Sequence, residues 1–408
     1  MSSGISTTKE QAGHGSPFIS FSTVFNNYFL PESLPDLMNT SEKEQNTYSV
    51  KKGDILVTRT SETIDELAMS CVALKDYPKA TYSGFTKRLR PKTDGVAYHK
   101  YLAFYMRGYI FRKTVTNNAF MTLRASFNED IFSFLNICLP EYSQQVKIGD
   151  MLYSMEKKIN NNNKINTELE AMAKTIYDYW FLQFDFPNEE GKPYRSSGGK
   201  MVWNEQLKRE IPEGWESIML GSLCKVISGY PFESSSYVED GTYKLITIKN
   251  VQDDGINLDV DNHIEELPNN LPAYCVLKRK DILLSLTGNV GRVGLMYDNN
   301  CLLNQRVAII EPMISELRGL LYFLFKQPHM KVKLESSATG TSQKNLSPIN
   351  TSQINIAYNK DVFMKYSKVT NSIIEKIVNN LSENLELTKL RDWLLPMLMN
   401  GQVTVELD

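Results

Sequence analysis

The chain has 408 residues, a net charge of −2 and 42% apolar residues, which indicates two or three globular domains with sizeable cores. A polar N-terminus and the lack of an apolar run long enough to span a bilayer argue against a secretory signal and a membrane segment, so we expect a cytoplasmic protein. The five cysteines form no CxxC pair and the four histidines lie far apart, which argues against disulfides and a metal cluster.

The first domain is predicted to cover residues 1–142. It contains VKKGDILVTRT at 50–60, which reads as a turn and a strand, and TYSGFTKRLRP at 81–91, a second strand ending in proline. An aromatic helical stretch, YLAFYM at 101–106, follows, and NICLP at 136–140 reads as a short closing strand.

A basic stretch runs through this domain from Lys75 to Arg124. It holds eleven lysines and arginines against only two acidic residues, Asp76 and Asp94, and several of them alternate with Tyr and Phe. The pattern favours a surface that follows DNA phosphates over a plain solvated face, although the net charge of the whole chain argues weakly against nucleic acid.

The first long helix is predicted for residues 143–183. Its apolar seam is spaced mostly by three and four residues, as in a coiled coil, and includes Ile159, Asn162, Asn166 and Leu169. An aromatic cluster of Tyr177, Tyr179, Trp180 and Phe181 stands at its end. The cluster either packs against the adjoining domain or belongs to a partner interface, where aromatic residues are enriched.

The remaining chain repeats this plan. Residues 184–210, rich in Pro, Gly, Ser and charge, are predicted to be a linker, residues 211–359 a second mixed α/β domain, residues 360–400 a second long helix and residues 401–408 a C-terminal tail. The second seam includes Ile377, Asn380, Asn384 and Leu387, together with Val369 and Leu390.

An internal repeat of about 220 residues links the two halves. KINNNNKINTEL at 158–169 and KIVNNLSENLEL at 376–387 match at seven of twelve positions at an offset of 218. LKRKDILLSLT at 277–287 and LLNQRVAIIEP at 302–312 repeat the two strands of the first domain, LLYFLF at 320–325 the aromatic helix, and NIAYN at 355–359 the closing strand.

The asparagines repeat on both seams. A polar side chain in a helix–helix core lowers stability but specifies register and partner, which favours that role over a hydrated edge position.

The two domains differ at their starts. The second opens with GWESIMLGSLCKVISGY, whereas MSSGIS at the beginning of the chain matches only Ser228 and Gly229 of that run. Either the first copy closes differently or the N-terminus lacks residues. The tail VTVELD is a speculative substitute strand.

This plan resembles the specificity subunits of Type I restriction–modification systems. The resemblance covers nearly the whole chain and rests on the repeat and on several motifs in order: IPEGW at 211–215, the KxxDILL strand, TGNVGRVG at 287–294, NQRVAII at 304–310, GTSQKNLS at 340–347, and IYDYWFLQFDFPNEEGKPYRSSGGKMVW after the first helix.

The resemblance implies an α+β fold in which two mixed α/β target-recognition domains alternate with two long helices. The helices pair as an antiparallel coiled coil, with a pseudo-twofold internal repeat. Each domain is implied to read one half of a bipartite, asymmetric site in double-stranded DNA, and the helices to dock two modification subunits. These methylate adenine with S-adenosylmethionine, while restriction subunits, which are motor–nucleases, use ATP and Mg; no cofactor is expected on this chain.

Candidate DNA-binding residues are polar or basic side chains on loops, since Asn and Gln pair with adenine and Arg with guanine or phosphate. Each glycine-containing loop is equally well read as a plain turn, and Asn304–Gln305 as a support for loop backbone. The candidates in the first domain are Arg59, Thr60, Tyr82, Ser83, Lys87, Arg88, Asn118 and Arg124. Those in the second are Ser228, Gly229, Tyr230, Thr287, Gly288, Asn289, Asn304, Gln305, Arg306, Thr341, Ser342 and Gln343.

An enzyme is the main rival interpretation. The sequence has no glycine-rich S-adenosylmethionine loop, no Asn/Asp-Pro-Pro-aromatic motif and no GxxxxGK[ST] loop, and the acidic residues Asp259, Asp261 and Glu265 lack a following ExK. A solitary DNA-binding protein acting without a modification partner is the other alternative, and the paired long helices argue against it.

Overall fold

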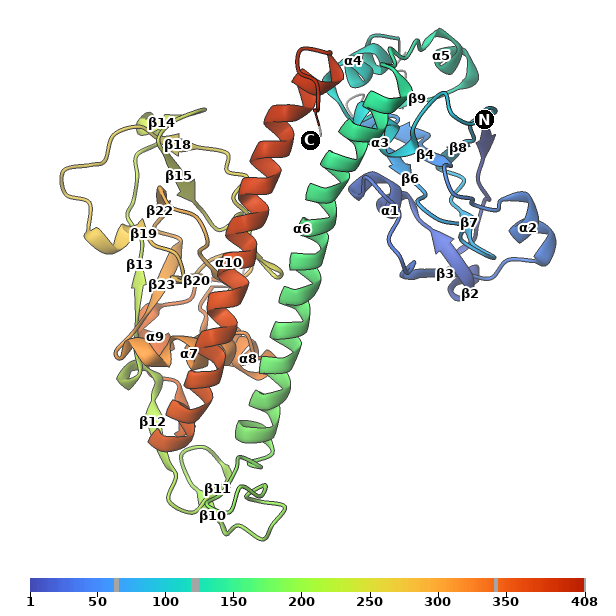
Figure 1. Cartoon of the computed structure of the whole chain (residues 1–408). Coiled ribbons are helices and arrows are strands. Elements are labelled where there is room, and N and C mark those ends of the chain that lie inside the picture. The colour runs from blue at the N-terminus through green and yellow to red at the C-terminus, as the bar shows by residue number, and fades with distance from the viewer. Residues whose placement is uncertain (62–65, 119–124, 341–343, 407–408) are drawn as a thin grey trace. The chain divides into compact units, whose positions relative to one another are not determined.

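The computed structural model describes residues 1–61, 66–118, 125–340 and 344–406 (Figure 1). These form two compact units: unit 1 is Met1–Ile159 with Glu386–Asp408, and unit 2 is Asn160–Leu385. Both long helices contribute residues to both units.

Unit 1 contains short helices and small sheets. Its helices are α1 (Phe21–Asn26), α2 (Glu42–Thr47), α3 (His99–Tyr105), α4 (Tyr109–Asn118) and α5 (Glu129–Phe134). Its strands are β1 (Ser2–Ser3), β2 (Ala12–Ile19), β3 (Asp36–Met38), β4 (Ile55–Thr58), β5 (Thr60–Ser61), β6 (Ser70–Val72), β7 (Thr81–Tyr82), β8 (Thr86–Leu89) and β9 (Ala125–Ser126).

The main sheet of unit 1 has the order β1–β8–β4–β6, with antiparallel neighbours. All four residues of β4 are buried, as expected of an uninterrupted apolar run in a central strand. A second sheet, β3–β2–β7, pairs β2 with β7 in parallel. The largest core of the unit joins α3 and β4 to Ile148 and Leu152 of the first long helix and to Leu395 and Leu398 of the second.

Unit 2 is built on two larger sheets. Its strands are β10 (Met201–Asn204), β11 (Arg209–Pro212), β12 (Glu216–Met219), β13 (Cys224–Ser228), β14 (Tyr237–Val238), β15 (Tyr243–Ile246), β16 (Val251–Gln252), β17 (Gly255–Ile256), β18 (His263–Ile264), β19 (Val276–Leu277), β20 (Ile282–Ser285), β21 (Val293–Leu295), β22 (Cys301–Leu303), β23 (Val307–Pro312) and β24 (Asn355–Tyr358). Its short helices are α7 (Arg318–Phe325), α8 (Pro328–Ser337) and α9 (Pro348–Ser352).

The sheet β13–β23–β20–β21 of unit 2 repeats the main sheet of unit 1. The five-stranded sheet β14–β18–β15–β22–β19 pairs β15 with β22 in parallel, as β2 pairs with β7 in unit 1. The two strand-to-strand frames therefore correspond, which confirms the predicted repeat at the level of topology.

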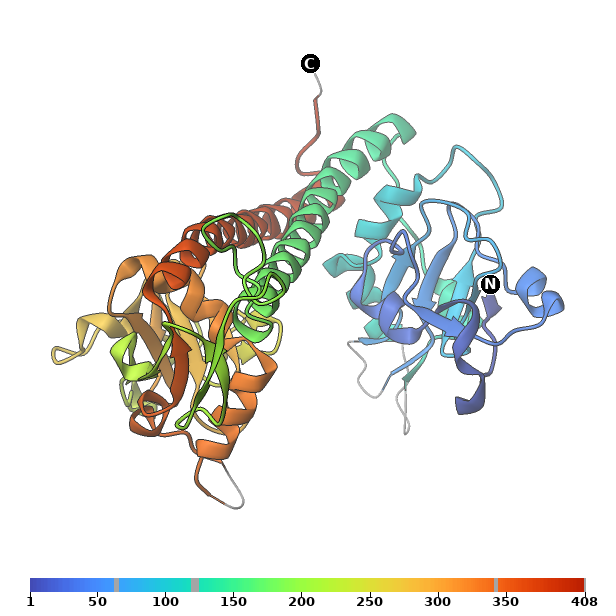
Figure 2. The same cartoon turned by 90° about the horizontal axis from the view of Figure 1, so that it is seen from below.

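The long helices are α6 (Tyr142–Tyr177), which continues into a π-helical segment Asp178–Leu182, and α10 (Lys360–Met399). Within unit 2 they lie side by side and antiparallel (Figure 2). Asn162 donates to Asn384 (2.9 Å) and Asn380 to Asn166 (2.8 Å) across the seam. Within unit 1 the same antiparallel pairing joins Glu156 to Arg391. The predicted fold class is confirmed.

The seam of α10 differs from the prediction at two positions. Val369 and Leu390 are 43% and 42% exposed, whereas Thr370, Ile374 and Val378 are buried. In unit 2, α10 packs on α6 and also on its own domain, where Thr370 lies against Gly319 of α7. A helix that buries two adjacent faces does not follow a single heptad stripe.

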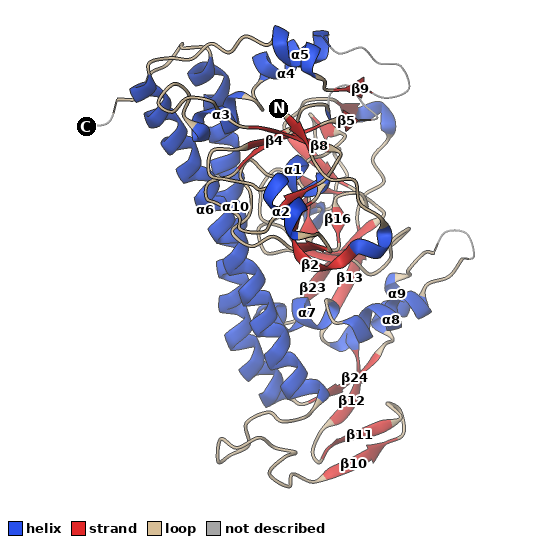
Figure 3. Ribbon diagram, turned by 90° about the vertical axis from the view of Figure 1, so that its right-hand side faces the viewer, coloured by secondary structure: helices blue, strands red, loops and turns tan. Residues whose placement is uncertain are grey.

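Residues 184–210 differ from the expected open linker. Phe184 and Phe186 are buried against Trp215, and Phe186 stacks on Tyr194 at 4.8 Å. The segment also supplies β10 and the start of β11, a hairpin that extends beyond the ends of the long helices in unit 2 (Figure 3). Burial of its aromatic side chains orders the segment in spite of its Pro- and Gly-rich composition.

Two predicted strands of unit 1 are absent from its described residues. NIAY forms β24 by pairing with β12, but NICLP at 136–140 has no strand equivalent to β12 beside it and stays irregular. The tail at 403–406 is not a strand either, and Val405 packs into the core near Leu398 and Met399. Unit 1 does have a counterpart of β13, because β1 pairs with β8 as β13 pairs with β23.

Candidate nucleic-acid interface

In unit 2, loops from four parts of the chain meet at one end of the main sheet. A hollow of about 640 Å³ lies between them. Its lining combines residues from the end of β13, the segment after β20, the turn between β22 and β23, and the loop before α9: Ser228, Leu286, Thr287, Gln305, Arg306, Asn345, Leu346, Ser347 and Pro348. The structure thus brings together predicted residues that are far apart in the sequence. These loops, with the lining residues just given, are called the loop cluster of unit 2 below.

Backbone hydrogen bonds hold these loops in place. The Gly229 N–H donates to Val307 O (3.0 Å), the Tyr230 N–H to Leu303 O (2.9 Å) and the Gln305 N–H to Tyr230 O (3.0 Å). A Cβ on Gly229 would lie 2.3 Å from Leu303 O, so only glycine permits this approach of two backbones. This glycine is a close-packing position rather than a plain turn.

A second set of bonds adds the remaining loops. The Leu286 N–H donates to Arg306 O (3.0 Å), the Leu346 N–H donates to Leu286 O (2.8 Å), and Thr287 forms a β-bridge with Asn345. The Gln305 and Arg306 side chains are exposed, and the described part of the chain gives neither an intramolecular side-chain hydrogen bond. They are free to bond to a ligand.

Unit 1 repeats these backbone hydrogen bonds, called the backbone frame below, with different residues, and its equivalent loops form the loop cluster of unit 1. The Gly4 N–H donates to Thr86 O (3.2 Å), the Ile5 N–H to Tyr82 O (2.9 Å) and the Gly84 N–H to Ile5 O (2.7 Å). A Cβ on Gly4 would lie 2.2 Å from Ser83 O. Gly4 therefore occupies the place that Gly229 has in unit 2.

The second set of bonds is also repeated. The Arg59 N–H donates to Phe85 O (2.7 Å), the Phe127 N–H donates to Arg59 O (2.7 Å), and Thr60 pairs with Ser126. The predicted residues Arg59, Thr60 and Ser83 are brought together here. Phe85, 59% exposed, stands where unit 2 has Arg306.

Three other candidates in unit 1 are buried or bonded within the unit. Tyr82 is fully buried, with its hydroxyl 2.7 Å from Ser2 Oγ, and Lys87 is only 8% exposed. Burial lowers the pKa of Lys87, with a smaller effect from Arg59. Arg88 lies over the Tyr82 ring and donates to Ser49 O. Tyr82 and Arg88 therefore bond within the unit, whereas the buried Lys87 lies near Arg59.

Asn118 bonds back to Thr114 O (2.8 Å) within α4. Arg124, Thr341, Ser342 and Gln343 lie outside the described residues.

In unit 2, the turn residues divide between support and exposure. Asn304 is 8% exposed, and its Oδ1 accepts the Arg306 N–H (3.3 Å), so it supports the loop backbone. Gly288 and Asn289 are exposed, and Gly288 has a φ of +69° that glycine accommodates without strain.

The basic stretch does not form a surface for phosphates as a whole. Arg107 is mostly buried and donates to four backbone carbonyls, Arg90 pairs with Asp54 (2.6 Å), and Lys100 pairs with Asp150 (2.7 Å). Charge counted along the sequence does not reveal such internal partners.

Sequence reasoning missed Ile5, Phe85 and Asn345. The signal for Ile5 is the match of Gly4 to Gly229 in the sequence, because the residue after each glycine makes the equivalent backbone bond. Phe85 is apolar and so fell outside a search for donors and acceptors.

The aromatic cluster mostly packs inward. Tyr177 and Phe181 are buried in the core of unit 2 and Trp180 packs partly against it, whereas Tyr179 is 51% exposed. Among the described residues, no three His, Cys, Asp or Glu side chains gather as a metal site. No helix in the described ranges is long and apolar enough to cross a membrane.

Comparisons with known proteins agree with this architecture. The model of the Type I restriction modification DNA specificity domain matches residues 4–171 and 212–388, one match per repeat. The Type I restriction enzyme MjaIX specificity subunit of Methanocaldococcus jannaschii is 26% identical, covering 98% of this chain and 89% of its own. The HindI specificity subunit of Haemophilus influenzae is 25% identical, covering 95% and 94%.

A solved structure also shares the fold. The S subunit of a Type I restriction-modification system from M. genitalium superimposes with a TM-score of 0.60 at 16% identity, covering 100% of this chain and 94% of that one.

Proposed function

Because the chain belongs to the family of Type I restriction–modification specificity subunits, we propose that it recognises a bipartite, asymmetric site in double-stranded DNA through its two loop clusters. One observation carries the proposal: the same backbone frame presents Ser83-Gly84-Phe85 in unit 1 and Asn304-Gln305-Arg306 in unit 2. One frame with two different sets of side chains suits two different half-sites.

The chemistry of each cluster fits the grooves of DNA. In unit 2, Arg306 can donate two hydrogen bonds to guanine and Gln305 can bond adenine, and both side chains are exposed. In unit 1, Phe85 offers an apolar face for a thymine methyl group, beside Arg59 and Thr60.

The long helices supply surfaces for partner subunits. On α6 and its π-helical end, Ile165, Met172 and Tyr179 are 40%, 55% and 51% exposed at seven-residue spacing, apart from the buried seam. On α10, Leu390 is the repeat mate of Met172 at the offset of 218 and is 42% exposed. An exposed apolar side chain at this pair of repeat-related positions suits docking of two copies of one modification subunit.

In this proposal the chain itself carries out no catalysis. The modification subunits bind S-adenosylmethionine and methylate adenine, and restriction subunits use ATP and Mg. The assembly acts on DNA in the cytoplasm.

The test is to co-express the chain with its modification subunit in a methylation-free bacterial host and to map methylated adenines across the genome. We expect a split, asymmetric motif with a fixed gap. Exchanging residues 1–140 for those of a relative should change one half only. An assembled complex that leaves the genome unmethylated contradicts the proposal.

Two point variants locate the readers. Arg306→Ala should relax the motif in one half, and Phe85→Ala in the other, each by roughly 1–3 kcal/mol at the affected base pair. Arg279→Ala serves as a matched control, because Arg279 bonds Asn379 of α10 (2.7 Å), outside the cluster. If both reader variants leave the motif unchanged, the loop clusters are not the DNA-reading surface.

A further inference from the structure

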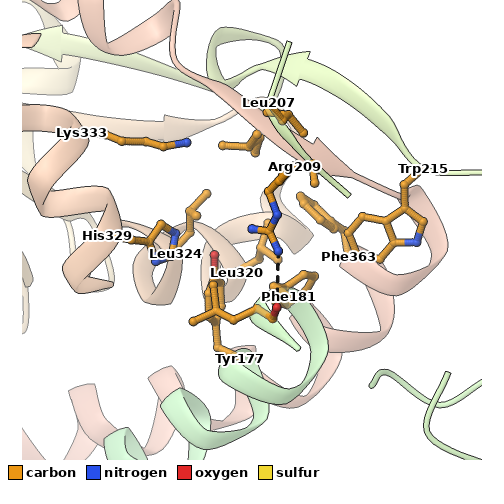
Figure 4. A pocket seen from close by; sticks show the side chains of 13 residues that line it. Tyr177, Phe181, Leu207, Arg209, Trp215, Leu320, Leu324, His329, Lys333 and Phe363 are labelled. Carbon is orange, nitrogen blue, oxygen red and sulfur yellow. Dashed lines mark hydrogen bonds between the residues drawn. The ribbon is translucent and has the colours of Figure 1, made fainter. Parts of the chain in front are cut away.

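A second cavity lies in unit 2, between the end of α6, β11, α7, α8 and β24, and has a volume of about 280 Å³ (Figure 4). Aromatic and aliphatic side chains form much of its wall, among them Phe181, Trp215, Leu320, Leu324 and Phe363. It shares no lining residue with the loop cluster.

Three basic side chains and a phenol surround the same space. Arg209 comes from β11, His329 and Lys333 stand one turn apart on α8, and Tyr177 comes from the end of α6 (Figure 4). Arg209 and Lys333 supply positively charged hydrogen-bond donors, and the Tyr177 hydroxyl supplies a neutral one.

No acidic residue lines the cavity. In the described part of the chain, Arg209 and Lys333 have no carboxylate partner. Arg209 donates to Leu182 O (3.3 Å) and Lys333 to Asn355 O (3.2 Å), both neutral carbonyls. Arg209 is exposed and Lys333 is half-buried, so an anion that enters the cavity would meet two cationic groups for which the described residues supply no carboxylate.

The mutual repulsion of these groups appears in their pKa values. Burial lowers the pKa of Lys333, and the nearby Arg209 lowers it further. Burial also lowers the pKa of His329, with contributions from Lys333 and Arg209 that Asp178 partly offsets. Burial raises the pKa of Tyr177, which keeps its hydroxyl protonated as a donor. A bound anion would relieve the repulsion.

We propose that this cavity binds a small organic anion, a flat apolar ring that carries a carboxylate or a phosphate. The ring packs among Phe181, Trp215 and Phe363, and the anionic group accepts hydrogen bonds from Arg209 and Lys333. An apolar cavity of about 150 Å³ holds benzene, so the larger volume here accommodates a ring together with its anionic group. The site stands apart from DNA recognition and does not depend on it.

Titration calorimetry on the full chain tests the proposal with four probes: phenylacetate, phenyl phosphate, benzyl alcohol and inorganic phosphate. We expect one of the two ring anions to bind saturably at one site per chain. The better ring anion identifies the anionic group. Benzyl alcohol and inorganic phosphate should bind at least about tenfold more weakly, since each lacks one half of the ligand.

Variants on α8 separate the cavity from the surface of the helix. Lys333→Gln should weaken the better ring anion by about tenfold, and Lys333→Arg, which keeps the charge, should retain most of the binding. Lys331→Gln is the matched control, because Lys331 lies on the same helix but pairs with Asp253 (3.1 Å) outside the cavity. Thermal unfolding monitored by circular dichroism checks that each variant is folded.

Three outcomes would overturn the proposal. The first is that neither ring anion binds saturably, and the second is that inorganic phosphate binds as tightly as the ring anions. The third is that folded Lys333→Gln binds the better ring anion no more weakly than Lys331→Gln does.

Discussion

The two units hold their loops with the same backbone hydrogen bonds but offer different side chains. In unit 1 the turn is Ser83-Gly84-Phe85, and in unit 2 it is Asn304-Gln305-Arg306. The first turn residue supports the backbone in both units, since Ser83 Oγ accepts the Phe85 N–H and Asn304 Oδ1 the Arg306 N–H. The third residue, Phe85 or Arg306, points its exposed side chain outward and can change without disturbing the backbone hydrogen bonds. A surface built in this way can change its ligand while its scaffold stays constant.

The units also differ in how their parts of the helix pair are held together. In unit 1 Glu156 of α6 and Arg391 of α10 form an ion pair whose side chains are 10% and 13% exposed. In unit 2 asparagines join the two helices, Asn162 to Asn384 and Asn380 to Asn166, and Asn162 also donates to the Glu383 carboxylate (2.8 Å). The following changes test these differences.

Arg391→Met should have the largest effect and lower the free energy of unfolding by about 3–5 kcal/mol, because it leaves the buried Glu156 carboxylate without its partner. Urea unfolding of the full chain measures it. The double variant Arg391→Met with Glu156→Leu should recover most of the loss. A single variant as stable as the parent would show that the pair contributes nothing.

Gly229→Ala should reduce stability by about 3 kcal/mol, since its Cβ would meet Leu303 O at 2.3 Å. In Gly4→Ala the added Cβ would lie 2.2 Å from Ser83 O. Because β1 is a two-residue edge strand that can detach, this variant should lower the free energy of unfolding by less than Gly229→Ala. Equal losses in the two variants would mean that both frames are equally rigid.

Asn162→Ala should lower stability by roughly 1–3 kcal/mol, because it leaves the buried Asn384 Oδ1 without a donor. Asn161→Ala is the control on α6, where the side chain is exposed. Thermal unfolding compares the two, and identical midpoints would exclude a role for the asparagine layer in stability.

A smaller effect is expected from pH. His99 in unit 1 and His329 in unit 2 both have a pKa lowered chiefly by burial. The unfolded chain, with histidine pKa values near 6.5, therefore binds more protons as the pH falls. Stability present above about pH 6.5 should be lost as the pH falls through the folded-state pKa. His99→Gln and His329→Gln should each reduce the slope of the free energy of unfolding against pH between pH 7.5 and about pH 5. An unchanged slope in either variant would exclude that histidine as a source of the pH dependence.

Local pattern predicted much of the fold. β4, β20 and β23 are short apolar runs, and α6 and α10 follow a three-and-four spacing, so both kinds of element were found from the sequence. The strand at NICLP was wrong because a strand needs a neighbour, and unit 1 has no equivalent of β12 among its described residues.

The candidate site was only partly predictable. Ser228, Thr287, Gln305 and Arg306 could be named as polar loop residues, but nothing local shows that they line one hollow. Lys87 and Arg107 looked like phosphate ligands, yet their charges are buried in the domain.

The sequence by itself determined the repeat, the two domains, the paired helices and their asparagine layer, because periodicity and self-similarity are properties of the chain alone. Only the tertiary structure decided which side chains face outward, that Gly4 and Gly229 hold equivalent loops, and that Arg209 and Lys333 meet in an apolar cavity. Those outcomes depend on contacts between residues far apart in the chain, and burial, pairing and close backbone approach arise only when the strands and helices pack.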